Sequence, residues 1–341
     1  MKRVQYRFWI VLAGLLAAAA AHAELDREAF IRLGSKVLKI EARRVQGGYS
    51  LGSGVVVEAD KVVTNCHVTR ESREVYVVRG EARWRATLQA SDVSHDLCVL
   101  QVPGLRGEIV KLGSAAGLKV GQPVIAIGFT GGLGIQNSAG EVVSLHRLDG
   151  GNVVQSTNWF SSGASGGALF DEELRLVGIL TYRLRGGAAH YFSAPAEWVT
   201  PLLSGPAAFR EVAPLEAREL AYWQRPVDQQ PDFLQAAILE RDLKWAELET
   251  LASGWSRSAA DDPLPWYLRG LALTKLDRLP DAQQSFERSL AIEPAQSAAW
   301  FQLGLLYVRQ GLLERARQAR ARLEGLKSDL ALDLSKVLDK R

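Results

Sequence analysis

The chain has 341 residues, a length that suits two domains of ordinary size, and a formal net charge of +3. Three positive charges, on Lys2, Arg3 and Arg7, lie within the first 23 residues, which contain no acid. Without those residues the chain would carry no net charge, which gives no reason to expect nucleic acid or an anionic membrane as a partner. Only two cysteines occur, and no Cys/His cluster, so we expect no metal site and no cofactor.

Residues 1–23 are predicted to form a secretory signal peptide. The basic start is followed by 14 uncharged residues, Phe8–Ala21, and small residues stand at Ala21 and Ala23. A membrane anchor is the alternative, but a span needs roughly 18 to 20 apolar residues. We expect cleavage after Ala23 and export to the periplasm, with secretion as the alternative, and no membrane span in the mature chain.

Residues 24–203 are predicted to form a β domain. Ten short segments rich in β-branched residues lie between Ser35 and Ser193, with turn residues between them and no long helical pattern. They read KVLKIEARR, GSGVVVEA, KVVTNC, EVYVV, LCVLQV, VIAIGF, EVVSLHRL, NVVQST, LRLVGILTYRL and HYFSAP. A break over residues 102–123 divides them into two comparable halves. This pattern predicts an all-β domain of two small barrels.

Residues 204–229 carry Pro, Gly and charges and are predicted to be a linker, whereas residues 230–341 have the composition and spacing of helices. A pattern repeats within this last part at a period of 34 residues. The repeated pairs are Trp266 and Trp300, Gly270 and Gly304, and Ala282 and Ala316. With Phe286 and Pro294 at matching offsets, this resembles the tetratricopeptide repeat, and a weaker copy lies near Asp232–Asp262. A generic array of helical hairpins is the alternative.

A serine in the stretch SSGASGGALF, Ser165, stands among three glycines. A hydroxyl becomes a good nucleophile only when a base removes its proton and a third group orients that base. His67 follows the apolar segment in VVTNCHVT, and Asp96 precedes another in SDVSHDLCVL. His67 and Asp96 belong to one half of the β domain and Ser165 to the other, as expected for a site between two barrels.

Other residues compete less well for these roles. Asp92 is the rival to Asp96, but it lies further from the apolar segment. His95 adjoins Asp96 and is expected to point away from it, and His146 and His190 are expected to be structural.

These motifs, GSGVVV, VVTNCHV, SHDLCVL and SSGASGGAL, together with LVGILTY and HYFSAP, resemble those of the chymotrypsin-like (trypsin-like) serine peptidases, with the HtrA/Deg branch as the nearest match. The resemblance covers about Ser35 to Leu203. It implies a double six-stranded barrel that hydrolyses peptide bonds. It makes Ser165 the nucleophile, His67 the general base and acid and Asp96 the orienting carboxylate. The backbone N–H groups of Gly163 and Ser165 would form the oxyanion hole.

The chain also departs from the family. Ala164 stands where the digestive enzymes carry the Asp that pairs with a new N-terminus, so we expect no activation of that kind. Trp159, six residues before Ser165, replaces the pocket Asp of trypsin and is followed by Phe160. These two residues are expected to line a substrate pocket that takes a small or aliphatic side chain rather than Lys or Arg. Helical repeats follow the β domain where HtrA/Deg proteins usually carry PDZ domains.

Cys66 adjoins His67, and Cys98 follows Asp96 by two residues. An even pair of cysteines in an exported chain is a disulfide candidate, and this pair would meet if the triad assembles. The alternative is two buried cysteines acting as small apolar residues.

Together these features predict an exported serine endopeptidase that acts on protein or peptide substrates through an acyl-enzyme. The repeats are expected to recruit a protein partner, a substrate tail or a second copy of the chain. A non-catalytic binding scaffold or chaperone, built on a protease-like barrel, is the alternative.

Overall fold

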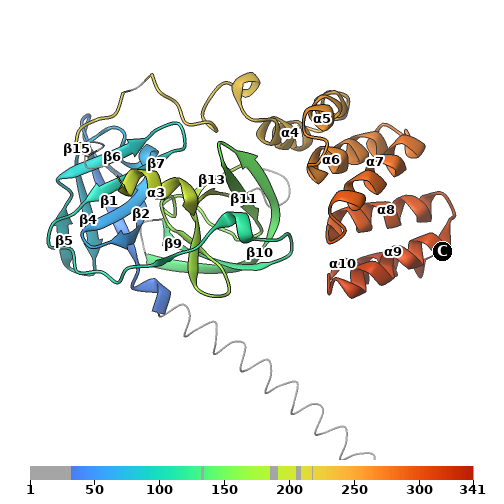
Figure 1. Cartoon of the computed structure of the whole chain (residues 1–341), viewed down its shortest axis with the longest axis horizontal. Coiled ribbons are helices and arrows are strands. Elements are labelled where there is room, and N and C mark those ends of the chain that lie inside the picture. Colours follow the sequence, from blue (N-terminus) through green and yellow to red (C-terminus); the bar gives the residue numbers. More distant parts are fainter. Residues whose placement is uncertain (1–31, 132–133, 185–190, 205–208, 217, 341) are drawn as a thin grey trace, which may run out of the picture.

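A computed structural model describes residues 32–131, 134–184, 191–204, 209–216 and 218–340. Two β-barrels are followed by a series of helices (Figure 1). The predicted signal peptide, residues 1–23, lies outside the described residues. Of the helices in the described ranges, none combines the length and apolar character that crossing a bilayer requires.

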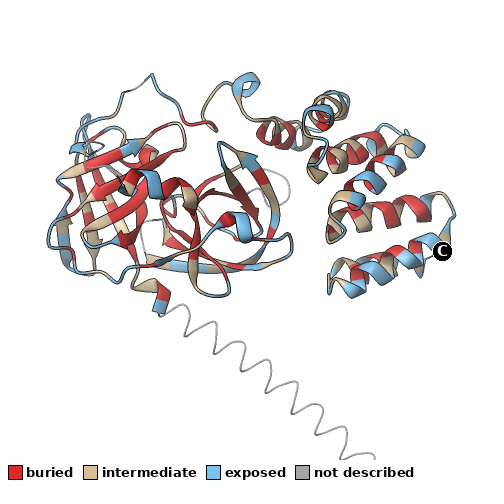
Figure 2. Cartoon of the chain, viewed as in Figure 1, coloured by how far each residue is buried: buried red, intermediate tan, exposed pale blue. Residues whose placement is uncertain are grey.

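The first barrel is an antiparallel sheet in the order β15-β6-β7-β3-β2-β1-β4-β5. Its strands are β1 (Val37–Arg44), β2 (Tyr49–Glu58), β3 (Lys61–Asn65), β4 (Ser72–Arg79), β5 (Ala82–Arg85), β6 (Leu88–Asp92), β7 (Leu97–Gln101) and β15 (Arg210–Glu211). β5, at one end of the sheet, leads directly into β6, which lies next to β15 at the other end. Valine runs such as Val55–Val57 are buried inside, because β-branched side chains pack well on a pleated surface (Figure 2).

The second barrel is a closed ring. Its sheet has the order β12-β9-β10-β11-β14-β13-β8, and an additional pairing of β12 with β13 closes six of these strands. The strands are β8 (Lys111–Leu112), β9 (Pro123–Thr130), β10 (Gly134–Leu148), β11 (Gly151–Ser156), β12 (Ala168–Phe170), β13 (Arg175–Arg183) and β14 (Tyr191–Pro195). The fold class predicted from the sequence, a trypsin-like double barrel followed by helices, is confirmed.

Each of the ten predicted segments contains a strand, and five further strands in the described ranges lacked a clear signal. β5 is polar and mostly exposed, β6 has no β-branched residue, β8 and β15 have two residues each, and β12 has three. Such strands are specified by their neighbours in the sheet rather than by their own periodicity.

The chain ends in helices that pack in antiparallel pairs. They are α4 (Asp232–Arg241), α5 (Trp245–Ser258), α6 (Pro263–Lys275), α7 (Leu279–Ile292), α8 (Ser297–Arg309), α9 (Leu313–Gly325) and α10 (Leu330–Leu338), after the short helices α2 (Cys66–Thr69) and α3 (Val199–Leu203). The 34-residue period has a packing cause. A Cβ on Gly270 would lie 2.7 Å from the Phe286 ring, so only glycine lets α6 approach α7 this closely. Ala282 and Ala316, one period apart, are both fully buried in the helical region.

The junction between barrels and helices is packed rather than extended. β15, from the predicted linker, pairs with β6. Phe233 of α4 stacks on His146 of β10 with ring centroids 4.3 Å apart, and it belongs to the core cluster of the barrels. The first helix of the tail is therefore anchored on the second barrel. The domain limits at residues 203/204 and 229/230 stay predictions.

Candidate active site

His67 and Asp96 lie side by side because the strands that carry them pair. β3 ends at Asn65, directly before α2, and Asn65 is opposite Leu97, the first residue of β7. The chain thus leaves the sheet just before His67, at the same edge where it enters the sheet again just after Asp96. Asp96 adopts a left-handed φ of 60°, a conformation that Asp tolerates better than most side chains.

The two side chains make a close, two-point contact. His67 Nδ1 lies 2.6 Å from Asp96 Oδ2, and the His67 backbone N–H donates to Oδ1 at 2.8 Å. Asp96 is 1% exposed, whereas the His67 side chain keeps 25% of its surface. Because a carboxylate only accepts hydrogen bonds, the proton lies on Nδ1, and Nε2 remains available as a base.

Further contacts hold this edge of the first barrel. The Asp96 carbonyl oxygen accepts from Asn65 Nδ2 at 2.9 Å and from the Cys66 N–H at 3.2 Å. Cys66 and Cys98 are joined by a disulfide, with Cα atoms 4.9 Å apart. The cross-link therefore ties the segment that carries His67 to the strand that follows Asp96.

The loop that carries Ser165 belongs to the second barrel but is held by the first. Ser53 of β2 donates from Oγ to the Gly163 carbonyl at 2.8 Å and accepts the Phe129 N–H at 2.8 Å. The Ser53 N–H donates to the Ser165 carbonyl at 2.7 Å. Gly166 has a φ of +85°, and a Cβ there would lie 2.1 Å from the Ser53 carbonyl oxygen. The glycines thus let one backbone approach another.

Ser165 lies in this loop with its hydroxyl donating to the Thr181 carbonyl at 3.4 Å. Within the described residues, no hydrogen bond joins this hydroxyl to His67. The backbone N–H groups of Gly163 and Ser165 likewise have no acceptor in the described part of the protein. These two N–H groups can therefore donate hydrogen bonds to a ligand atom that binds beside the Ser165 hydroxyl.

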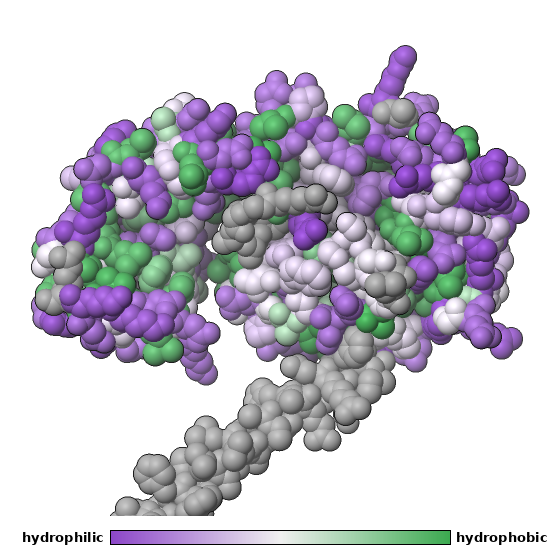
Figure 3. Space-filling view, turned by 180° about the vertical axis from the view of Figure 1, so that it is seen from behind, coloured by the Kyte–Doolittle hydropathy of each residue, from purple (hydrophilic) through white to green (hydrophobic). Residues whose placement is uncertain are grey.

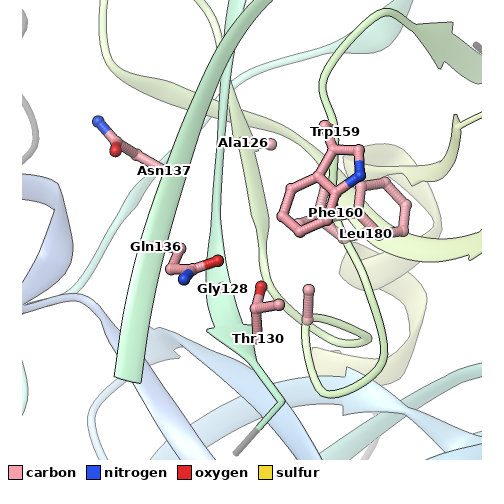
Figure 4. Close-up of a pocket in the computed structure, with 9 residues that line it drawn as sticks. Ala126, Gly128, Thr130, Gln136, Asn137, Trp159, Phe160 and Leu180 are labelled. Atoms are coloured by element: carbon pink, nitrogen blue, oxygen red, sulfur yellow. The ribbon is translucent and has the colours of Figure 1, made fainter. Parts of the chain in front are cut away.

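A small cavity adjoins the loop. It has a volume of about 10 Å³, room for roughly one water. Trp159, Phe160, Ala164 and polar side chains of β10 line it, and Figure 4 shows the Trp159 and Phe160 rings beside Leu180, across from Gln136 and Gly128. Phe160 is buried, whereas Trp159 is 51% exposed.

Asp92, the rival of Asp96, contacts a different histidine. His95 Nδ1 lies 2.6 Å from Asp92 Oδ2, and Nε2 lies 3.1 Å from Asp149 Oδ2. Burial lowers the pKa of His95, but the hydrogen bonds and charges of Asp92 and Asp149 outweigh it and raise the pKa above 6.5. Burial raises the pKa of Asp92, and its bonds to His95 and Ser94 outweigh that effect, so its pKa is lowered. This cluster joins the first barrel to the turn between β10 and β11 of the second, and none of these contacts involves Ser165. His190 lies outside the described residues.

One contact at the site had no sequence signal strong enough to find it. Trp223, from the predicted linker, donates from Nε1 to Asp96 Oδ2 at 3.1 Å and meets the His67 ring edge-on at 5.5 Å. The hint in the sequence was the adjacent aromatic pair Tyr222 and Trp223 in a stretch that otherwise carries Pro, Gly and charges among small and aliphatic residues.

Comparison with known proteins agrees with this architecture. Residues 52–179 match the model of the trypsin-like peptidase domain. The periplasmic serine endoprotease DegP of Escherichia coli K12 is 32% identical over 167 residues, which are 46% of this chain and 35% of that protein. A probable DegP-like periplasmic serine endoprotease of Buchnera aphidicola is 30% identical over 176 residues, 48% of this chain and 37% of that protein. The matched residues thus make up about a third of the length of each of these relatives.

Among solved structures, the active form of the Rv3671c protease from M. tuberculosis superposes with a TM-score of 0.52 at 25% identity. The superposition covers 57% of this chain and 90% of that one. The range that matches the family model, residues 52–179, lies in the two barrels and contains His67, Asp96 and Ser165. The barrels of this chain therefore have the fold of a trypsin-like peptidase domain, and their sequence is similar to that of proteases of the HtrA/Deg type.

Proposed function

We propose that the chain is an exported serine endopeptidase that uses His67, Asp96 and Ser165 as its catalytic triad. The observation that carries the proposal is the two-point contact of buried Asp96 with His67, at the edge where both barrels meet the Ser165 loop. A surface histidine has no need of a buried carboxylate that fixes its tautomer, whereas a general base does.

The proposed reaction proceeds through an acyl-enzyme. The Ser165 hydroxyl turns from the Thr181 carbonyl toward His67, whose Nε2 accepts its proton as Oγ attacks the substrate carbonyl. Asp96 stabilises the imidazolium that forms, and the N–H groups of Gly163 and Ser165 bind the oxyanion. His67 then gives the proton to the leaving amine, and water repeats the sequence on the acyl-enzyme.

We propose that the cavity beside Ala164 receives a substrate side chain next to the scissile bond. Its volume of about 10 Å³ admits a methyl group better than an aromatic ring. No acidic side chain lines it, so a lysine or arginine would lose its hydration without a partner. The enzyme should therefore favour alanine or a comparably small residue, which a digest of an unbiased peptide library measures.

A fluorophosphonate probe tests the triad directly. Full-length protein should be labelled, and Ser165→Ala should not. The loop supplies matched controls, because Ser161→Ala and Ser162→Ala remove neighbouring hydroxyls and should keep the label. If folded wild type stays unlabelled with and without added peptides, the catalytic proposal is wrong and the binding scaffold becomes the better account.

The helical repeats are proposed to recruit a partner or substrate. A groove of about 660 Å³ lies between α7, α8 and α9. Arg315 lies over the Tyr307 ring at 5.7 Å and Arg322 over the Trp300 ring at 5.9 Å, with Glu287 as the acid among the lining residues. Hydrophobic side chains are exposed among hydrophilic ones on the helical part (Figure 3). Two guanidinium groups beside aromatic rings suit a peptide that carries carboxylates.

Recruitment and catalysis can be separated by substrate size. Arg315→Gln with Arg322→Gln should slow the cleavage of a protein substrate with an acidic tail and leave hydrolysis of a short peptide unchanged. Arg317→Gln is the matched control, because this exposed residue on α9 does not line the groove. Equal rates for the protein substrate in all variants would refute recruitment through this groove.

Export is proposed from the predicted signal and the periplasmic relatives. Cell fractionation should place the protein in the periplasm, and N-terminal sequencing should begin at Glu24. A cytoplasmic chain that keeps residues 1–23 would overturn this assignment.

A further inference from the structure

The segment of residues 218–224 returns from the end of the barrels to the candidate triad. The Tyr222 N–H donates to the Ser94 carbonyl at 2.9 Å, and Arg70 donates to Gln224 Oε1 at 3.2 Å and to the Glu219 carbonyl. These contacts fix the segment both to the loop before Asp96 and to the residue that follows α2. The segment lies outside residues 52–179, the range that matches the peptidase domain.

Trp223 reaches the catalytic pair from this segment with both its ring and its N–H. The ring stacks on Tyr182 of β13, with centroids 5.0 Å apart and an interplanar angle of 9°. Nε1 donates to Asp96 Oδ2, the oxygen that also contacts His67 Nδ1. The Asp96 carboxylate thus accepts three hydrogen bonds, of which two come from His67 and the third from Trp223.

Packing alone does not account for this arrangement. A phenylalanine would stack on Tyr182 and meet the edge of His67 equally well, but it would leave Asp96 Oδ2 with one donor fewer. A hydrogen bond to a charged group is stronger than one between neutral groups and restricts the rotation of the carboxylate. Rotation of Asp96 would move Oδ2 away from His67 Nδ1, so the Trp223 N–H stabilises the orientation of the pair.

The segment continues into the helical repeats through side-chain hydrogen bonds. Gln230 Nε2 donates to the carbonyls of Trp223 at 3.1 Å and Arg225 at 2.7 Å. Gln235 of α4 donates in turn to the Gln230 carbonyl at 2.7 Å. Gln230, which is itself bonded to α4, therefore helps to fix the position of Trp223.

We propose that Trp223 is a positioning residue that orients the Asp96–His67 pair, delivered by the segment that connects the peptidase domain to the helical repeats. The inference rests on the proposed function. It assigns a part of the site to a region beyond the peptidase domain, so barrels that end before residue 218 would lack the third donor to Asp96.

Steady-state hydrolysis of a short peptide by the full-length protein tests the proposal. Trp223→Phe keeps the aromatic ring and removes the N–H, and it should lower kcat about tenfold with KM changed less than twofold, because the loss affects the chemical step. Trp198→Phe is the matched control. It removes an indole N–H that donates to the Asp149 carbonyl rather than to Asp96, and should keep kcat.

A second variant tests the connection to α4. Gln230→Ala should lower kcat about threefold by releasing the Trp223 carbonyl. In the Trp223→Phe background it should have no further effect, because the segment acts through the N–H already removed. Additive losses would mean that Gln230 stabilises the fold independently of Trp223.

The outcomes separate the two proposals. If wild type neither hydrolyses the peptide nor labels Ser165, the proposed function fails and this inference with it. If wild type is active and Trp223→Phe keeps kcat within twofold, or loses activity through KM alone, the positioning role is refuted and the proposed function stands. If Trp223→Phe unfolds at a lower urea concentration than Trp198→Phe, Gln230→Ala decides, and an unchanged kcat there refutes the role.

Discussion

Reduction of the Cys66–Cys98 disulfide should destabilise the first barrel by a magnitude that the structure sets. The cysteines are 32 residues apart in sequence. In the chain-entropy model, opening a loop of this length raises the conformational entropy of the unfolded chain and so lowers the free energy of unfolding by about 3.7 kcal/mol at room temperature. If the free energy of unfolding falls by about 2–3 kcal/mol per molar urea, the urea concentration at the unfolding midpoint should fall by about 1–2 M.

The assay is urea unfolding of wild type with and without a thiol reductant, combined with a count of free thiols. Reduction leaves every side-chain heavy atom in place, so the difference reports the cross-link alone. The double variant Cys66→Ala with Cys98→Ala is the control, and its unfolding midpoint should be the same with and without the reductant. An unchanged wild-type midpoint at two free thiols per chain would refute the reasoning.

Three other substitutions test the packing around the site and in the repeats. Ser53→Ala leaves the partly buried Phe129 N–H and the buried Gly163 carbonyl unpaired and should cost about 2 kcal/mol or more in urea unfolding; an unchanged midpoint would contradict it. The pKa of His95 is raised in the fold, so its ion pairs stabilise fully below pH 6.5 and progressively less as pH rises through the raised pKa. His95→Gln should therefore flatten the decline of wild-type stability above pH 6.5, and a persisting decline would point to another group. Gly270→Ala should cost about 1–3 kcal/mol by overpacking against Phe286, whereas Gly254→Ala, whose Cβ would meet only the Arg257 guanidinium at 4.0 Å, should not destabilise; equal effects would argue against the close contact.

The segments that carry the candidate triad were recognisable in the sequence because each has a local signature. His67 follows an apolar strand, Asp96 precedes another, and Ser165 lies among glycines whose need is now explained by the approach of the Ser53 backbone. The pairing of β3 with β7 brings the first two together. The roles of these residues stay predictions until labelling tests them.

Ser53 and Trp223 could not be found in this way. Ser53 is one polar residue in a valine-rich strand, and its importance comes from a loop 110 residues away. Trp223 lies in a stretch whose Pro, Gly and charges indicate a linker, and its contact with Asp96 spans 127 residues. A contact across such a separation has no local periodicity to reveal it.

The sequence by itself determined the two barrels, the helical tail with its 34-residue period, and the three segments that carry the candidate triad. Those features follow from short-range patterns, since strands, helices and turns have characteristic residue spacings. Only the tertiary structure decided which carboxylate faces His67, how Ser53 holds the Ser165 loop, and that the supposed linker packs against the site. These depend on hydrogen bonds whose partners are far apart in the chain and become neighbours only when the two barrels close.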